Sequence, residues 1–248
     1  MSLLVFLALV LPILLSGLSV FFLNISDKTL KLILAFGGAF LLTLTFTELI
    51  PEIYTSDSMQ VGLFVMLGFF IQLFLDFLTK GVEHGHHSHH VNLNEPCKKK
   101  QEKFNFVGLM VGISIHSFLE GMPLAENFQN VELKNVLLSG IIIHNIPISI
   151  VLVSLLLHTG VKKPMVVLLL FLFAFSSPIG TLTSYFFGLG VLENISSYFN
   201  YILAVVVGIF LHISTTILFE TDELHHFNLY KFIAIILGTA VAMISILV

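Results

Sequence analysis

Long apolar runs separated by short polar breaks make up almost the whole chain. The apolar residues within each run are continuous, as in VVLLLFLFAF from residue 166, and do not alternate with polar residues. A membrane-spanning helix needs about 20 mostly apolar residues, whereas a strand of a membrane barrel alternates over about 10 residues. The pattern therefore predicts eight membrane-spanning helices, at residues 2–23, 30–52, 60–79, 106–126, 134–157, 165–188, 199–220 and 229–248.

The composition supports the same fold class, an all-α integral membrane protein. Of the 248 residues, 56% are hydrophobic and 10% are charged, and a mean hydropathy of +1.01 excludes an ordinary soluble domain. The first run has no basic leading segment and is longer than the roughly 7–15 apolar residues of a cleaved signal peptide, so we assign it as the first span. We expect a single transmembrane domain over residues 1–248.

The lysines predict the orientation in the membrane. The chain has eleven lysines and no arginine, and ten lysines lie in or beside the connections after the first, third, fifth and seventh runs. Only Lys134 lies on the other side. Lysines in short connections mark the cytoplasmic side, so we expect both termini to lie outside. The net charge of −4 gives no reason to expect a nucleic-acid partner.

The longest polar stretch, residues 80–105, contains five of the eleven histidines. They are His84, His86, His87, His89 and His90. Because the stretch lacks hydrophobic periodicity, we expect a flexible cytoplasmic loop. Clustered imidazoles bind Zn²⁺, Cu²⁺ or Ni²⁺ near neutral pH. Two interpretations stay open, a loop that captures or senses metal and a polar tether.

The second and seventh runs resemble each other. At an offset of 170, GAFLLTLTFTELIPE from Gly38 aligns with GIFLHISTTILFETD from Gly208. The two runs are five spans apart and cross the membrane in opposite directions, which is the pattern of inverted repeats in secondary transporters. The window has four identities, a number that also arises by chance among apolar residues.

Three ionisable residues lie near the middle of predicted spans. His116 and Glu120 are four positions apart and so share one face of a helix. His144 lies at the corresponding depth of the next span, which a short connection makes an antiparallel neighbour. Such groups cost about 2.5–3.5 kcal/mol each at bilayer depth, so they usually have a function. The set suits Zn²⁺, with Fe²⁺, Mn²⁺, Co²⁺ and Cd²⁺ as competitors; the alternative is a structural hydrogen bond.

Helix-disrupting residues accompany these three groups. Gly121 and Pro123 follow Glu120, and Pro147 follows His144 by three positions. Proline removes a backbone donor and kinks a helix. We therefore expect a kink or local unwinding beside the ligands, either for packing or to free a carbonyl oxygen for the ion.

Short motifs recur at defined places in the spans: HSFLEG in the fourth, HNIP in the fifth, GGAFL and LIPE in the second, SPIG in the sixth and GIFL in the seventh. Taken together, these motifs resemble the ZIP family of divalent metal transporters over essentially the whole chain. The resemblance implies uptake of zinc or a related ion into the cytosol. It also implies a 3+2+3 arrangement of helices with inverted repeats, and an elevator-like movement of the helices that bind the metal.

The resemblance assigns His116, Glu120 and His144 to the primary metal site. Many members have further ligands, often acidic, at four other positions, which here are Ser117, Asn145, Ile148 and Ser177. The chain therefore resembles the branch of the family without an acidic ligand in the fifth span. We predict one principal metal site, to which Ser117 and Asn145 contribute weakly or through water.

Other polar residues near the span ends have less specific roles. Glu48, Glu52 and Glu126 either attract cations to the outer entrance or are interfacial carboxylates. Another group lies near the predicted cytoplasmic face and either relays the ion to the exit or simply occupies solvated helix ends. Its members are His158, Glu220, Asp222, Glu223, His225 and His226. His212 either lines the path or is structural. Gln72 and Asp76 share a face of the third span, for which we have no account.

A hydrolase and a receptor are the two alternatives to transport. An intramembrane zinc-dependent hydrolase would hold zinc with the two histidines and activate water with Glu120, but the chain has no H-E-x-x-H motif and no separate general base. A metal-sensing receptor would use residues 80–105 as its output, and no effector domain accompanies them. The chain has no G-x-x-x-x-G-K-[ST] loop, so ATP is not the energy source. Transport without enzymatic activity or a prosthetic group is the interpretation we favour.

The expected partners and location follow from that interpretation. The partners are the transported divalent cation, the lipid bilayer and, as a hypothesis, a second copy of the chain in a homodimer. We expect a multi-pass protein of a plasma membrane or a bacterial inner membrane.

Overall fold

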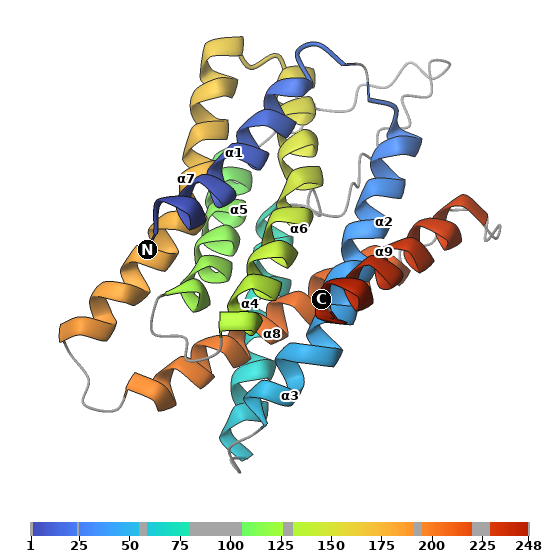
Figure 1. Cartoon of the computed structure of the whole chain (residues 1–248). Helices are drawn as coiled ribbons and strands as arrows, with labels where there is room; N and C mark the ends of the chain where they lie inside the picture. Colours follow the sequence, from blue (N-terminus) through green and yellow to red (C-terminus); the bar gives the residue numbers. More distant parts are fainter. Residues whose placement is uncertain are drawn as a thin grey trace.

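The computed structural model describes residues 2–23, 25–54, 59–79, 106–125, 131–190, 195–219 and 229–247. The predicted loop at residues 80–105 lies outside these ranges. Regular structure within them is entirely helical (Figure 1). The helices are α1 (Leu3–Ser19), α2 (Asp27–Leu44), η1 (Thr45–Leu49), α3 (Ile50–Ile53), α4 (Met59–Thr79), α5 (Phe106–Gly121), η3 (Met122–Leu124), α6 (Val131–His158), α7 (Lys163–Gly190), α8 (Ile195–Phe219) and α9 (Leu229–Leu247).

The all-α membrane architecture predicted from the apolar runs is confirmed. Seven of the described spans are long and apolar enough to cross a membrane, and α1 is an eighth apolar helix of 17 residues. The second span is one continuous rod in which α2 passes through η1, a π-helical turn, into α3. The local unwinding predicted beside Glu120 is present, because α5 stops at Gly121 and a 3₁₀ turn with Pro123 follows. Pro147, by contrast, lies inside α6, which is assigned as α-helix from Val131 to His158.

The outer surface of the bundle is apolar along whole helices. On α4, the exposed side chains include Met66, Phe70, Phe74 and Phe77, which recur every three or four positions along one face. A soluble monomer rarely exposes so large an apolar stripe. This face of α4 therefore suits contact with lipid, as does the exposed apolar surface of α9.

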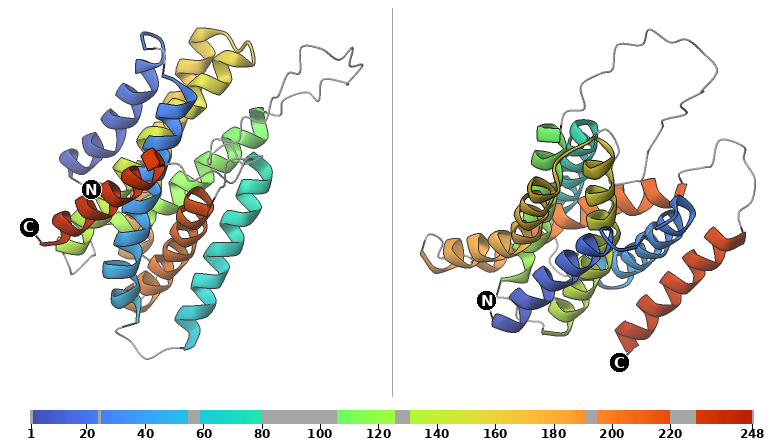
Figure 2. Two further views of the ribbon diagram at one scale, coloured as in Figure 1. Left: turned by 90° about the vertical axis from the view of Figure 1, so that its right-hand side faces the viewer. Right: turned by 90° about the horizontal axis from the view of Figure 1, so that it is seen from above.

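The helices form two groups. In one group α1 packs against α6 and α7, and α5 packs against α7; in the other, α4 packs against α8, and α2 packs against α8 and α9. Figure 2 shows the two groups from the side and from above. Ser16 on α1 and Ser149 on α6 share a hydrogen bond of 2.6 Å within the first group. The two groups meet where α2 contacts α6 and α4 contacts α5.

Glycines allow the closest helix contacts. A Cβ atom added to Gly68 on α4 would lie 1.9 Å from the carbonyl oxygen of Val205 on α8, and one added to Gly208 would lie 2.0 Å from that of Val65 on α4. On α9, a Cβ atom at Gly238 would lie 2.3 Å from the carbonyl oxygen of Phe36 on α2. The backbones of these pairs are therefore in direct contact.

These contacts support the repeat that the sequence predicted. Gly68 and Gly238 are 170 positions apart, the same offset that relates Gly38 to Gly208. If α2 and α8 are equivalent helices of the two repeats, and α4 and α9 likewise, then the contact between α4 and α8 corresponds to the contact between α9 and α2. The inverted repeat, the 3+2+3 arrangement and the outer location of the termini stay predictions, to which this correspondence adds a second aligned pair of glycines.

Replacing Gly68 with alanine is expected to destabilise the fold. The added methyl group would meet backbone, which has no alternative rotamer, so α4 and α8 would have to separate. Overpacking of this kind costs about 1–3 kcal/mol. The thermal unfolding temperature of the purified protein in detergent measures the effect.

Gly62→Ala is the matched control, since it lies on the same helix and its added Cβ atom would come only within 3.5 Å of the Tyr54 hydroxyl. Equal unfolding temperatures for the two variants would contradict the contact between α4 and α8.

Candidate metal centre

His116, Glu120 and His144 come together between α5 and α6. The Nε2 atom of His116 lies 2.8 Å from Oε1 of Glu120, and Nε2 of His144 lies 3.8 Å from the same oxygen. One potential ligand atom from each residue lies within 4.8 Å of the others. All three side chains are buried, with at most 1% of their surface exposed. The sequence prediction that they meet at one depth is thus matched by the geometry.

The three groups offer two imidazole nitrogens and one carboxylate oxygen. Zinc binds such ligands at about 2.0–2.2 Å, so neighbouring ligand atoms around a tetrahedral ion lie roughly 3.3 Å apart. The two nitrogen–oxygen distances, 2.8 and 3.8 Å, lie on either side of that value. Small side-chain adjustments would therefore suffice to receive an ion, and a fourth ligand position would stay open for water.

Asn145 orients the carboxylate. Its Nδ2 atom donates a hydrogen bond of 3.1 Å to Oε2 of Glu120, which leaves Oε1 directed toward the two histidines. The Oδ1 atom of Asn145 and the hydroxyl oxygens of Ser117 and Ser177 are buried and accept no hydrogen bond from the described residues. These oxygens are available as weak or water-mediated ligands, and that role stays a prediction for Ser117 and Asn145.

The neighbouring helix α7 supports the end of α5. A Cβ atom at Gly121 would lie 2.0 Å from the carbonyl oxygen of Ser177, so only glycine permits this approach. Thr181 on α7 donates a hydrogen bond of 2.8 Å to the carbonyl oxygen of Gly121, where α5 ends and the regular helical donor is lost. Gly121 therefore allows the end of the ligand helix to pack directly against α7.

The model of the ZIP zinc transporter family matches residues 98–246 of the chain, which include both helices that contribute the buried cluster. The chain belongs to the ZIP family. A search of curated proteins found no match to the chain. The ZIP match begins after α4, so the assignment of α1, α2 and α4 to the bundle rests on their packing.

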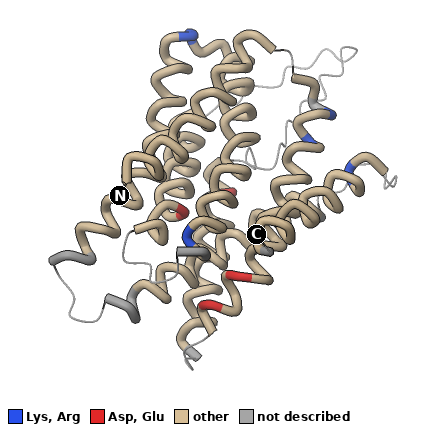
Figure 3. Tube along the Cα trace, in the orientation of Figure 1, with Lys and Arg blue, Asp and Glu red and all other residues tan. Residues whose placement is uncertain are grey.

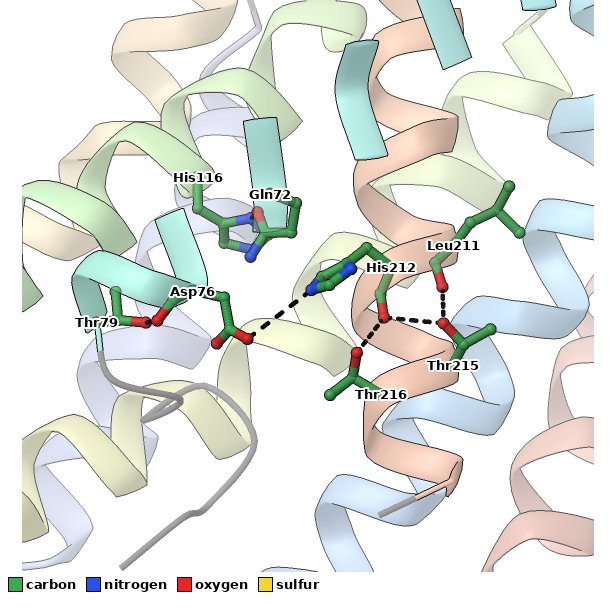
Figure 4. A network of polar contacts seen from close by, with 8 residues as sticks. All are labelled: Gln72, Asp76, Thr79, His116, Leu211, His212, Thr215 and Thr216. Atoms are coloured by element: carbon green, nitrogen blue, oxygen red, sulfur yellow. Dashed lines mark hydrogen bonds and ion pairs between the residues drawn. The ribbon is translucent and has the colours of Figure 1, made fainter. Parts of the chain in front are cut away.

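Two further polar contacts lie near His116, on the α4 side (Figure 4). The Oε1 atom of Gln72 lies 2.9 Å from Nδ1 of His116. One turn later, Oδ2 of Asp76 lies 3.8 Å from Nε2 of His212 on α8, and the ring of His212 packs edge-on against Phe69 at 4.8 Å. The shared face of Gln72 and Asp76 was visible in the sequence, but their partners on two different helices were not.

The remaining predicted positions that the structure describes lie outside the cluster of His116, Glu120 and His144. Glu48 and Glu52 are partly buried in η1 and α3, and His158 is exposed at the end of α6. Residues outside the described ranges include Glu126, Glu220, Asp222, Glu223, His225, His226 and the loop at 80–105. The entrance, exit and loop roles stay predictions.

Proposed function

We propose that this ZIP protein carries a divalent transition metal ion, preferentially zinc, into the cytosol by way of His116, Glu120 and His144. Members of the family transport divalent metal ions, and the observation that supports this site is the fully buried cluster of two imidazoles and one carboxylate. The ion is the cargo rather than a resident cofactor. An incomplete ligand shell suits an ion that must leave again.

We further propose that the site holds one ion at a time. Ile148, at a position where relatives often have a ligand, is a buried aliphatic side chain and offers no donor atom. Ser117, Asn145 and Ser177 are neutral. With Zn²⁺, one carboxylate and two neutral imidazoles, the buried site would keep a net charge of +1, so a second divalent ion beside the first would be strongly repelled.

The packing suggests which helices move. All three proposed ligands lie on α5 and α6, which belong to the same group as α1 and α7. The group of α2, α4, α8 and α9 contributes none of them. We propose that the first group moves with the ion against the second, which is the elevator-like movement expected from the family.

The proposed orientation in the membrane follows from the lysines. The turns between α1 and α2 and between α6 and α7 lie at the same end of the bundle (Figure 1), and most of the described lysines lie toward that end (Figure 3). We propose that this end is cytoplasmic and that both termini lie outside.

Zinc uptake by lipid vesicles that contain the purified full-length chain tests this function. We expect uptake without ATP, and competition by iron, manganese or cadmium will rank the ions. A vesicle preparation that takes up no divalent metal, yet cleaves a peptide substrate only when zinc is added, would favour the hydrolase instead.

A further inference from the structure

Gln72 contacts the second ring nitrogen of a proposed ligand. His116 directs Nε2 toward Glu120 at 2.8 Å, and its Nδ1 lies 2.9 Å from Oε1 of Gln72. Both Gln72 and His116 are fully buried. The two ring nitrogens therefore face partners on opposite sides. In the neutral ring, a proton on one nitrogen leaves the other without a proton.

The metal-binding tautomer of His116 requires a hydrogen-bond acceptor at Gln72. An ion on Nε2 uses the lone pair of that nitrogen, so the ring proton must reside on Nδ1. The carboxamide oxygen of Gln72 can accept that Nδ1–H. Without an ion, the proton can instead reside on Nε2 and be donated to Glu120, and a rotated carboxamide can donate its N–H to Nδ1.

An amide side chain can serve both tautomers, because it carries both an acceptor and a donor. A carboxylate at this position would accept from Nδ1–H but could not donate, and an aliphatic side chain would do neither. A carboxylate would also make the imidazole a stronger ligand, as carboxylate–histidine–zinc triads do. Glutamine orients His116 without adding the negative charge that would hold the ion more tightly.

The contact joins the two groups of helices. Gln72 lies on α4, which packs against α8, whereas His116 lies on α5, which packs against α7. The hydrogen bond between Gln72 and His116 therefore crosses the boundary between the groups, so the orientation of the ligand depends on how the groups meet.

We propose that Gln72 is a positioning residue for metal transport, which selects the tautomer of His116 that binds the ion while leaving the site able to release it. The proposal rests on the proposed function of the His116 site. It assigns to α4 a role in metal affinity although α4 contributes no ligand.

The test is zinc uptake by vesicles containing Gln72→Met, Gln72→Glu or wild-type full-length chain. Loss of such a hydrogen-bond partner typically costs about 10–100-fold in metal affinity, so Gln72→Met should raise KM for zinc by that factor. Gln72→Glu should lower KM and reduce the maximal rate several-fold, because the ion leaves more slowly. A purely structural role would reduce the amount of folded protein in both variants and would not move KM in opposite directions.

Thr79→Val is the matched control, since it replaces a buried polar residue on the same helix with a side chain of similar shape and should keep the wild-type KM. A wild-type KM in Gln72→Glu would overturn the proposal even if Gln72→Met failed to fold. Glu120→Gln separates the two claims: wild-type uptake by that variant would sink the proposed function, whereas its inactivity together with unchanged KM in the Gln72 variants would overturn only the role of Gln72.

Discussion

Zinc uptake is expected to fall to background when Glu120 is replaced with glutamine. Glu120 is the only carboxylate in the buried cluster, and its Oε1 atom faces both histidines. Glutamine keeps the size of the side chain and can still accept the hydrogen bond from Asn145, so the fold should persist. Loss of an outer hydrogen-bond partner already costs about 10–100-fold in metal affinity, and loss of the charged ligand itself should cost at least about 100-fold in uptake.

Uptake per folded protein in vesicles is the measurement for Glu120→Gln, with the unfolding temperature as a check on integrity. Glu48→Gln is the matched control, because Glu48 is an acidic residue of another span that lies outside the cluster. An entrance role for Glu48 would change KM but leave the maximal rate intact. Uptake by Glu120→Gln above one tenth of wild type would be incompatible with the site.

Replacing Asn145 with aspartate is expected to convert the site into a tighter and slower one. The Nδ2 atom of Asn145 lies 3.1 Å from Oε2 of Glu120, so the substitution places two carboxylates side by side in a buried region. Without a cation they repel each other, and a divalent ion between them removes the repulsion. The unfolding temperature should fall without zinc, and added zinc should raise it more than it does in wild type.

The same variant should show a KM for zinc at least about tenfold lower and a reduced maximal rate, since each added carboxylate strengthens binding of a divalent ion. Asn145→Ala is its control, because it removes the hydrogen bond to Glu120 without adding charge. An Asn145→Asp variant whose zinc-dependent stabilisation and KM equal those of wild type would show that position 145 does not face the ion.

Much of the fold was predictable because a bilayer imposes length and composition on each span. The predicted run at 60–79 corresponds to α4 (Met59–Thr79) almost residue for residue, whereas α8 (Ile195–Phe219) begins before the predicted run at 199–220. The length of α1 was less well predicted, since the apolar run continues to Leu23 whereas the helix ends at Ser19. The π-helical turn at Thr45–Leu49 was also missed, because no residue type in that stretch distinguishes a π-turn from an α-helix.

The ligand cluster was predictable because helical spacing and a short connection are local properties. His116 and Glu120 share a face by their separation, and the short connection between the two predicted spans indicated that His144 would lie at their depth. Gln72 shows the limit of such reasoning. Its spacing from Asp76 placed both on one face of α4, but their partners, on α5 and α8 respectively, depend on the packing of three helices that are distant in the sequence.

The inverted repeat was only partly predictable from the sequence. The sequence offered one window of similarity around Gly38 and Gly208, which chance could also produce. The packing added Gly68 and Gly238 at the same offset, each against a backbone carbonyl of the facing helix. Small residues at helix crossings leave little trace in a hydropathy pattern, so this second pair of the predicted repeat was recognised only through the contacts.

The most direct test of the site is the stoichiometry and X-ray absorption spectrum of zinc bound to the purified chain. Serine in place of the five histidines at positions 84, 86, 87, 89 and 90 prevents binding to the loop. We predict one zinc per chain, with two imidazole nitrogens and oxygen ligands at about 2.0–2.2 Å, and loss of that zinc in His144→Ala. Zinc that stays bound in full amount with an unchanged spectrum in His144→Ala would contradict the central claim that His116, Glu120 and His144 form the metal site.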